Sequence, residues 1–172
     1  MTPITHQRFF AHASILAGTA RMVLAFVPWQ NDSLFLQTVA ALIDIGFLAG
    51  LLGLYLSLAG RVDGPLRLVQ TTGFFLGFVG IASIVGPDAV MFGVDFYALG
   101  GGVALLGLTL LSTSWLVAGI GPRAATICWL GTFLLALATP FHPQAFAAMG
   151  FLFGAGFLCA GLWLHAQHKE QE

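Results

Sequence analysis

Two ionisable side chains lie inside the most apolar parts of the sequence. Arg21 stands in the run ILAGTARMVLAFVPW, and Asp44 stands in AALIDIGF. A charge near the bilayer centre costs about 2.5–3.5 kcal/mol on insertion scales, so such residues usually pair or face a polar cavity. At about 1.5 Å per residue, Arg21 lies about 18 Å into its segment and Asp44 about 15 Å into its own, from opposite ends. In a hydrocarbon core about 30 Å thick these levels agree, so we predict an intramembrane ion pair between Arg21 and Asp44.

This predicted pair is compatible with three roles. A purely structural pair would fix the register of two neighbouring helices. A pair that faces a polar cavity would handle a proton, an ion or an anionic group, which is the usual role of intramembrane ionisable residues. Alternatively, Arg21 could contact a partner subunit or a lipid headgroup. Four nearby polar side chains could extend a cavity, or could bond to carbonyls of their own helices: Ser14, Thr19, Gln37 and Thr38.

The other residue types that carry chemistry form no recognisable catalytic set. His12, His165 and His168 could meet at one end of a helical bundle and hold a metal or haem, although histidine is also typical of the membrane interface. Cys128 and Cys159 lie in apolar runs and are interpreted as small buried hydrophobes. The sequence contains no HExxH, CxxC or carboxylate cluster. We therefore predict a protein that is not an enzyme, with no catalytic residues, metal or cofactor.

The composition excludes a water-soluble domain. Of the 172 residues, 58% are hydrophobic and only 8% are charged, and the mean hydropathy is +0.93. A soluble domain carries about 25% charged residues. The net charge of −1 gives no indication of nucleic-acid binding. We predict one transmembrane domain over residues 1–172, surrounded by membrane lipids.

Six apolar segments are long enough to be considered as spans, since a bilayer core needs about 20 apolar residues per helix. They cover residues 9–28, 34–59, 67–86, 92–117, 123–140 and 144–166. Backbone groups in lipid must be hydrogen-bonded internally, so these segments are predicted to be helices. The fold class is therefore an all-α bundle of six transmembrane helices. The first segment is interpreted as a retained span, because Arg21 interrupts its apolar run and no clean cleavage site follows.

The distribution of basic residues predicts the orientation. Arg8, Arg61, Arg67, Arg123 and Lys169 occupy the two tails and the second and fourth connections, and Asp32, Asp88 and Asp95 flank the others. Lysine and arginine accumulate on the cytoplasmic side of membrane proteins. We therefore expect both termini in the cytoplasm of a bacterium and the chain in its inner membrane.

An internal repeat relates the even-numbered segments. Gly46, Gly100 and Gly154 are each 54 residues apart, and so are three later glycines that each precede a Leu-x-Leu pattern. The pattern predicts three helical hairpins over residues 9–59, 67–117 and 123–166. The positions equivalent to Arg21 hold Phe75 and Trp129. Both deep charges therefore belong to the first hairpin.

The glycines also indicate how the helices pack. Small residues four apart let helix backbones approach closely, as in GxxxG motifs. They are interpreted as contacts within one bundle, with an interface between copies of the chain as the alternative. The predicted packing positions are Gly46, Gly50, Gly53, Gly73, Gly77, Gly100, Gly107, Gly131, Gly150, Gly154 and Gly161.

Prolines that close the odd-numbered segments, together with glycine-rich even-numbered segments, carry a family resemblance. Pro28, Pro87 and Pro140, with Gly46 and its equivalents, resemble the HdeD-like acid-resistance membrane family. The resemblance implies six spans built from a repeated hairpin and an inner-membrane protein linked to acid or envelope stress. It implies no catalytic site, and neither Arg21 nor Asp44 belongs to the matched pattern.

Two classes of function are favoured by the sequence, and a third, a haem- or lipid-modifying enzyme, is disfavoured by the missing catalytic motifs. The first is a small non-enzymatic inner-membrane protein that is related to acid or envelope stress or moves a proton or a small solute, with Arg21 and Asp44 central. The second is an accessory or structural subunit that packs its glycine-rich faces against a larger respiratory, photosynthetic or transport complex. A homo-oligomer is compatible with both.

Overall fold

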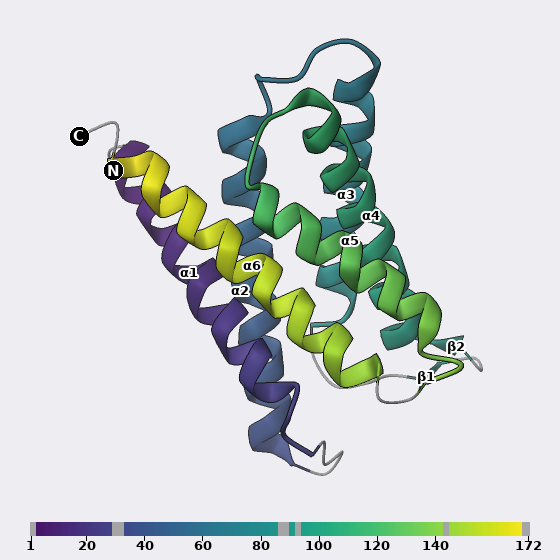
Figure 1. Ribbon diagram of the computed structural model, residues 1–172. Coiled ribbons are helices and arrows are strands. Elements are labelled where there is room, and N and C mark those ends of the chain that lie inside the picture. Colours follow the sequence, from purple (N-terminus) through teal and green to yellow (C-terminus); the bar gives the residue numbers. More distant parts are fainter. Residues whose placement is uncertain (1–2, 29–32, 86–89, 92–93, 143–144, 170–172) are drawn as a thin grey trace.

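The computed structural model describes residues 3–28, 33–85, 90–91, 94–142 and 145–169. Within these residues the chain is almost entirely helical, which confirms the predicted all-α class (Figure 1). Two short strands pair antiparallel between the third and fourth helices. The elements are α1 (Pro3–Leu24), α2 (Leu34–Leu58), α3 (Pro65–Ser83), β1 (Val90–Met91), β2 (Val94–Asp95), α4 (Phe96–Ala118), α5 (Arg123–Ala138) and α6 (Ala145–Lys169).

Four of the helices, α2, α3, α4 and α6, are long and apolar enough to cross a membrane. By the length and composition of its helices, the chain is therefore a membrane protein. α5 is shorter, with 16 residues. α1 has 22 residues, but His6, Arg8, His12 and Arg21 lower its hydropathy. Four of the six predicted spans are thus supported, and membrane crossing by α1 and α5 remains a prediction.

Capping side chains explain where two of the helices begin. Ser33 precedes α2 and its hydroxyl accepts a hydrogen bond from the Leu36 amide at 3.3 Å. Asp95 precedes α4 and accepts one from the Ala98 amide at 2.9 Å. Such caps satisfy amides that have no partner in the first turn of a helix. The sequence predicted that this helix would begin at residue 92. The cap at Asp95 explains why α4 begins at Phe96 instead.

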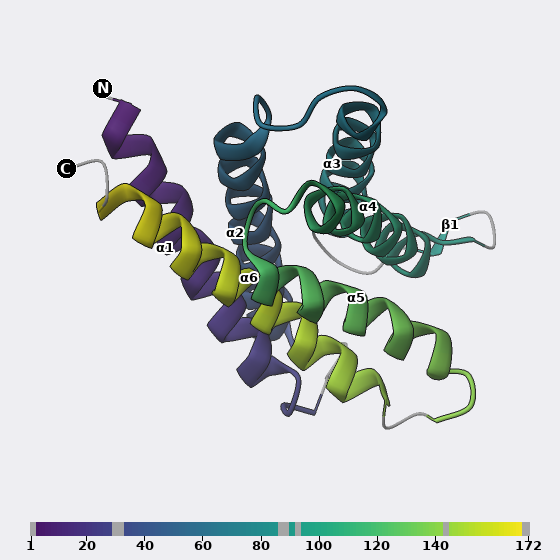
Figure 2. The same ribbon diagram turned by 45° about the horizontal axis from the view of Figure 1, so that its top comes forward.

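The six helices form a closed ring in chain order. Each helix contacts the next, and α6 contacts α1, while α2 also contacts α6 across the ring. α1 and α6 lie side by side in both views, with the two ends of the chain together at one end of this pair (Figures 1 and 2). The strands β1 and β2 lie at the opposite end of the molecule (Figure 1). Odd-numbered and even-numbered helices therefore run in opposite directions.

The half of the ring nearest the termini is filled by a core of large side chains. Trp115 and Trp129 are fully buried, with ring centroids 6.5 Å apart. Phe157 contacts Trp129 at 5.1 Å and stacks on Phe47 at 4.2 Å. These contacts connect α2, α4, α5 and α6. A second layer from α2, Leu54 and Leu58 among them, is also fully buried and closes the centre of the ring.

Glycines bring neighbouring helices into close contact. On α2, Gly46 lies against Ala17 and Gly50 lies against Ser14, both on α1. Between α3 and α4, Gly107 meets the backbone of Gly77. At each predicted packing glycine, atoms of a neighbouring helix lie within 4 Å of the position that a Cβ atom would occupy. These glycines therefore contact helices of the same chain, where small residues let backbones approach.

The third hairpin packs differently from the first two. Gly46 and Gly100 occupy equivalent repeat positions and face the preceding helix of their own hairpin, α1 and α3 respectively. The third equivalent, Gly154, faces α1 rather than α5. Instead, Gly156 faces α5, where its missing side chain leaves room for the indole of Trp129. The 54-residue sequence pattern thus does not give three hairpins with one packing arrangement.

Candidate functional site

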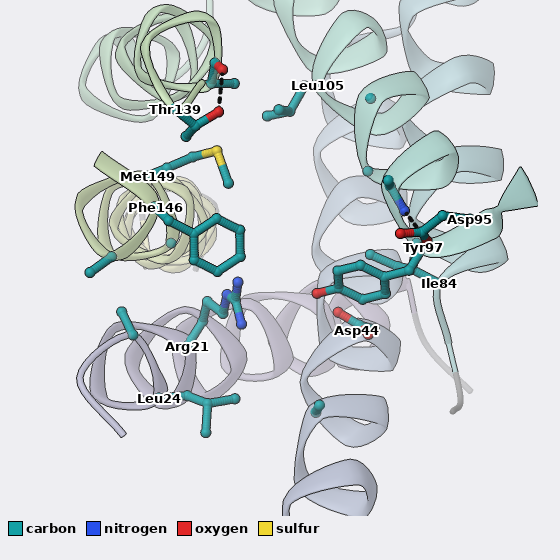
Figure 3. A pocket seen from close by; sticks show the side chains of 18 of the residues that line it. Arg21, Leu24, Asp44, Ile84, Asp95, Tyr97, Leu105, Thr139, Phe146 and Met149 are labelled. Atoms are coloured by element: carbon teal, nitrogen blue, oxygen red, sulfur yellow. Dashed lines mark hydrogen bonds between the residues drawn. The ribbon is translucent and has the colours of Figure 1, made fainter. Parts of the chain in front are cut away.

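A partly open cavity of about 900 Å³ lies among the helix ends opposite the termini. Its walls combine charged, polar and apolar side chains (Figure 3). Every helix, or the residue directly after it, contributes to the lining: Arg21 from α1, Asp44 from α2, Ile84 after α3, Tyr97 from α4, Ala136 from α5 and Phe146 from α6. The cavity thus occupies the half of the ring that the aromatic core leaves open.

Arg21 lies in the last turn of α1, because this helix ends at Leu24 rather than at residue 28 as predicted. A positive charge is favourable there, at the negative end of the helix dipole. Two glycines of α6 make room for the side chain. A Cβ atom at Gly154 would lie 3.0 Å from the Cβ of Arg21, and one at Gly150 would lie 3.4 Å from its Nη2. The guanidinium therefore lies close to α6 and faces the cavity (Figure 3).

Asp44 enters the same cavity from α2. The contacts of Gly46 with Ala17 and of Gly50 with Ser14 define the antiparallel register of α1 and α2. In this register Asp44 is level with residue 19 or 20 of α1, so it is displaced from Arg21 by only about 3 Å along the bundle axis. Both side chains are partly buried. The two charges of the first hairpin thus share one level and one cavity.

Arg21 and Asp44 border the same cavity, but no direct ion pair joins them within the described part of the chain. Figure 3 shows Arg21 beside Phe146 on one wall and Asp44 beneath Tyr97 on the other. The predicted contact pair is therefore corrected to two opposite charges on facing walls. A physical reason is that Gly150 and Gly154 leave room for the Arg21 side chain to lie beside α6.

Polar residues that the sequence analysis did not select complete the lining. Asp95 and Tyr97 lie at the start of α4, on the same wall as Asp44 (Figure 3). One carboxylate oxygen of Asp95 caps α4. Gln37 and Thr139 also line the cavity. Asp95 and Tyr97 were missed because they lie at a helix end, where polar residues are common, and only the ring of helices brings them to Asp44.

Of the four residues predicted to extend the cavity, Gln37 does so and three do not. Ser14 is fully buried and donates a hydrogen bond to the carbonyl of Phe157 at 2.7 Å. Thr38 is exposed and donates to the carbonyl of Leu34 in its own helix at 2.8 Å. Thr19 is exposed on α1. Thr19 and Thr38 lie on other faces of their helices than Arg21 and Gln37. Ser14 shares the face of Arg21, but it lies about two turns nearer the termini, where the side chain is buried in the core.

The end of the bundle near the termini brings two of the predicted histidines together. The rings of His12 and His165 are 5.6 Å apart, between α1 and α6. The side chain of His168 lies outside the described residues. The part of the chain that the structure describes contains no group of three or more histidine, cysteine or acidic residues that could hold a metal ion. This pair therefore lacks a third ligand among the described side chains.

Comparisons with models of known protein families, with curated proteins and with solved structures gave no match for this chain. The resemblance to the HdeD-like family therefore remains a prediction from prolines and glycines. Function must be argued from the cavity and its residues.

Proposed function

We propose that this chain is a non-enzymatic protein of a bacterial inner membrane that takes up a proton or a small polar solute into the cavity from the outer face. One observation carries the proposal: Arg21 and Asp44 face a cavity of about 900 Å³ without a direct ion pair between them. Ionisable residues within a membrane are costly and rare, and those that face a cavity usually mark the path or the site of an ion or a substrate.

The distribution of charge supports an outward-facing opening. Arg61, Arg67 and Arg123 are exposed at the end of the bundle that carries the termini. By the positive-inside rule this end faces the cytoplasm. The cavity, at the other end, then opens to the outer face. The buried core around Trp115 and Trp129 closes the cytoplasmic half, so passage across the membrane requires a rearrangement of the ring.

Proton handling is tested with purified protein in liposomes that contain a trapped pH-sensitive dye. After an external pH step, we expect a protein-dependent change in internal pH that Asp44→Asn reduces several-fold. The matched control is Asp63→Asn, which removes a carboxylate that is exposed in the connection between α2 and α3. Equal fluxes for wild type and Asp44→Asn would remove the proton from the proposal and leave only the solute.

The orientation is tested separately with a cysteine placed in the cavity. Ala40 lines the cavity from α2, so Ala40→Cys in a background without Cys128 and Cys159 should react with a membrane-impermeant thiol reagent added outside spheroplasts. Leu56→Cys, on an exposed face of the same helix nearer the termini, serves as the control that should not react. Reaction of Ala40→Cys only after the membrane is opened would reverse the proposed orientation.

The alternative is an accessory subunit that packs its glycine-rich faces against a larger membrane complex. The glycine contacts count against it, because Gly107, Gly154 and the other predicted packing positions lie against helices of this chain. Co-purification with a partner at fixed stoichiometry would favour the alternative. A stable, monodisperse protein without partners would favour the proposal.

A further inference from the structure

The two walls of the cavity carry opposite charge. Arg21 presents a guanidinium from the side of α1 and α6, and Asp44 presents a carboxylate from α2 on the facing side (Figure 3). Asp95 adds a second carboxylate to the wall of Asp44. A charge in a partly buried site needs a partner or water to compensate for lost hydration. The α1 dipole and the polar lining supply part of this compensation, and an occupant of the space between the walls can supply the rest.

The guanidinium is placed to receive an anion. Gly150 and Gly154 leave room for it beside α6, so it lies close to that helix and borders the cavity. Arginine binds carboxylates through two parallel hydrogen bonds, which are stronger than hydrogen bonds between neutral groups. A carboxylate-bearing solute would therefore match this wall, whereas a cation on its own would be repelled by it.

The facing wall is placed to receive a cation. Asp44 supplies the negative charge, and Tyr97 lies directly beside it (Figure 3). An ammonium group is attracted both to a carboxylate and to the face of an aromatic ring. An anion on its own would be repelled by Asp44 and Asp95. Each wall therefore rejects the ion that the other attracts.

The space between the walls suits a short apolar connection. Leu105, Phe146 and Met149 line it with apolar surface. Its volume of about 900 Å³ lies within the range of small-molecule sites, about 300–1,000 Å³. An apolar chain would contact these side chains while its two charged ends reach the two walls.

From these features we infer that the cavity binds a small zwitterion, a solute with a carboxylate facing Arg21 and an ammonium group facing Asp44 and Tyr97. This inference rests on the proposed function, because it names the class of solute that the outward-facing cavity takes. It assigns different ends of one ligand to the two deep charges. A direct ion pair would leave neither of them available.

The test uses three probes of nearly equal shape on the purified full-length protein in detergent. Glycine betaine carries both charges, 3,3-dimethylbutyrate replaces its nitrogen by carbon and keeps only the carboxylate, and ethyltrimethylammonium keeps only the cation. At equal ionic strength, thermal unfolding and calorimetry should show binding of glycine betaine and much weaker binding of the other two. Loss of one charge-assisted interaction corresponds to roughly 10- to 100-fold in Kd.

Matched variants assign the two ends. Arg21→Gln and Asp44→Asn should each weaken glycine betaine binding by about 10-fold or more. Arg21→Gln should also reduce the preference of the protein for glycine betaine over ethyltrimethylammonium, and Asp44→Asn should reduce its preference for glycine betaine over 3,3-dimethylbutyrate. Arg123→Gln and Asp63→Asn, which change exposed residues outside the cavity, should bind like the wild type. Circular dichroism of each variant separates loss of binding from loss of folding.

Two results would overturn the inference. If ethyltrimethylammonium or 3,3-dimethylbutyrate binds the wild type as tightly as glycine betaine, the cavity is a site for a single charge, and the proposed uptake of a polar solute still stands. If none of the three binds, the inference is wrong, and the proton-flux comparison of wild type with Asp44→Asn decides separately whether the proposed function also fails.

Discussion

Gly154 of α6 faces Gly18 of α1 so closely that a Cβ atom at Gly154 would lie 2.7 Å from the carbonyl oxygen of Gly18. This contact joins the last helix to the first and so closes the ring. The same glycine also accommodates the Cβ of Arg21. Gly154 therefore contributes both to the packing of α1 on α6 and, together with Gly150, to the placement of Arg21.

We expect Gly154→Ala to destabilise the protein by about 1–3 kcal/mol, the usual cost of overpacking a tight contact. The control is Gly102→Ala, which places a methyl group in open space on α4 and should stabilise that helix by about 0.5–1 kcal/mol. Thermal unfolding in detergent, followed by circular dichroism, measures both. A neutral Gly154→Ala would show that α1 and α6 are further apart than the structure places them.

The helical class could be predicted from the sequence because hydropathy depends on composition alone. Most apolar segments coincide with helices. Helix ends were predicted less well, since they depend on single capping groups such as Asp95. The arrangement of the helices was not predictable from the repeat. Phe75 and Trp129 both occupy the position equivalent to Arg21, but Phe75 is exposed and Trp129 is fully buried. Equivalent positions of the repeat therefore have different neighbours in the ring.

Part of the candidate site could be predicted from the sequence, because an isolated charge inside a membrane is energetically costly. Arg21 and Asp44 could be singled out on this ground and assigned to one level. Their lack of direct contact could not be predicted, because it follows from the glycines of α6, a helix that is distant in the sequence. Tyr97 gave no signal for a similar reason, since only the packing of α4 places it beside Asp44.

The separation of the two charges should be visible in a double-mutant cycle. We expect Asp44→Asn with Arg21→Gln to be less destabilising than the sum of the single changes, with a coupling energy of about 1 kcal/mol or less, because solvent in a partly open cavity screens the attraction. Chemical unfolding of the four proteins gives this energy. A coupling of about 3–5 kcal/mol, as for a buried contact pair, would show that the two side chains touch.

The buried hydroxyl of Ser14 should contribute to the contact between α1 and α6. Its hydrogen bond to the Phe157 carbonyl, at 2.7 Å, joins two helices, and such bonds in membrane proteins contribute on average about 0.6 kcal/mol. We therefore expect Ser14→Ala to lower the free energy of unfolding by roughly this amount or somewhat more. Thr38→Val, which removes a hydroxyl bonded within its own helix, should have almost no effect. Equal losses for both variants would contradict the interhelical assignment.

The two cysteines provide a direct test of how α5 packs on α6. Trp129 faces Gly156, and Gly131 faces Leu152, so the two helices are antiparallel in a register that sets Cys128 opposite Cys159. The Cys159 thiol lies close to the Cys128 thiol. No other cysteine is present in the chain.

We therefore expect dibromobimane, which fluoresces when it links two thiols, to label the folded wild type at an intramolecular Cys128–Cys159 link that mass spectrometry identifies. Cys159→Ser should abolish this fluorescence. Moving the thiol to the exposed neighbour with Cys159→Ser and Leu162→Cys should not restore it, because Leu162 lies on a face of α6 that is 52% exposed. If Cys128 and Cys159 each react singly and are never linked, the register of α5 on α6 is wrong, and with it the wall that α5 contributes to the cavity.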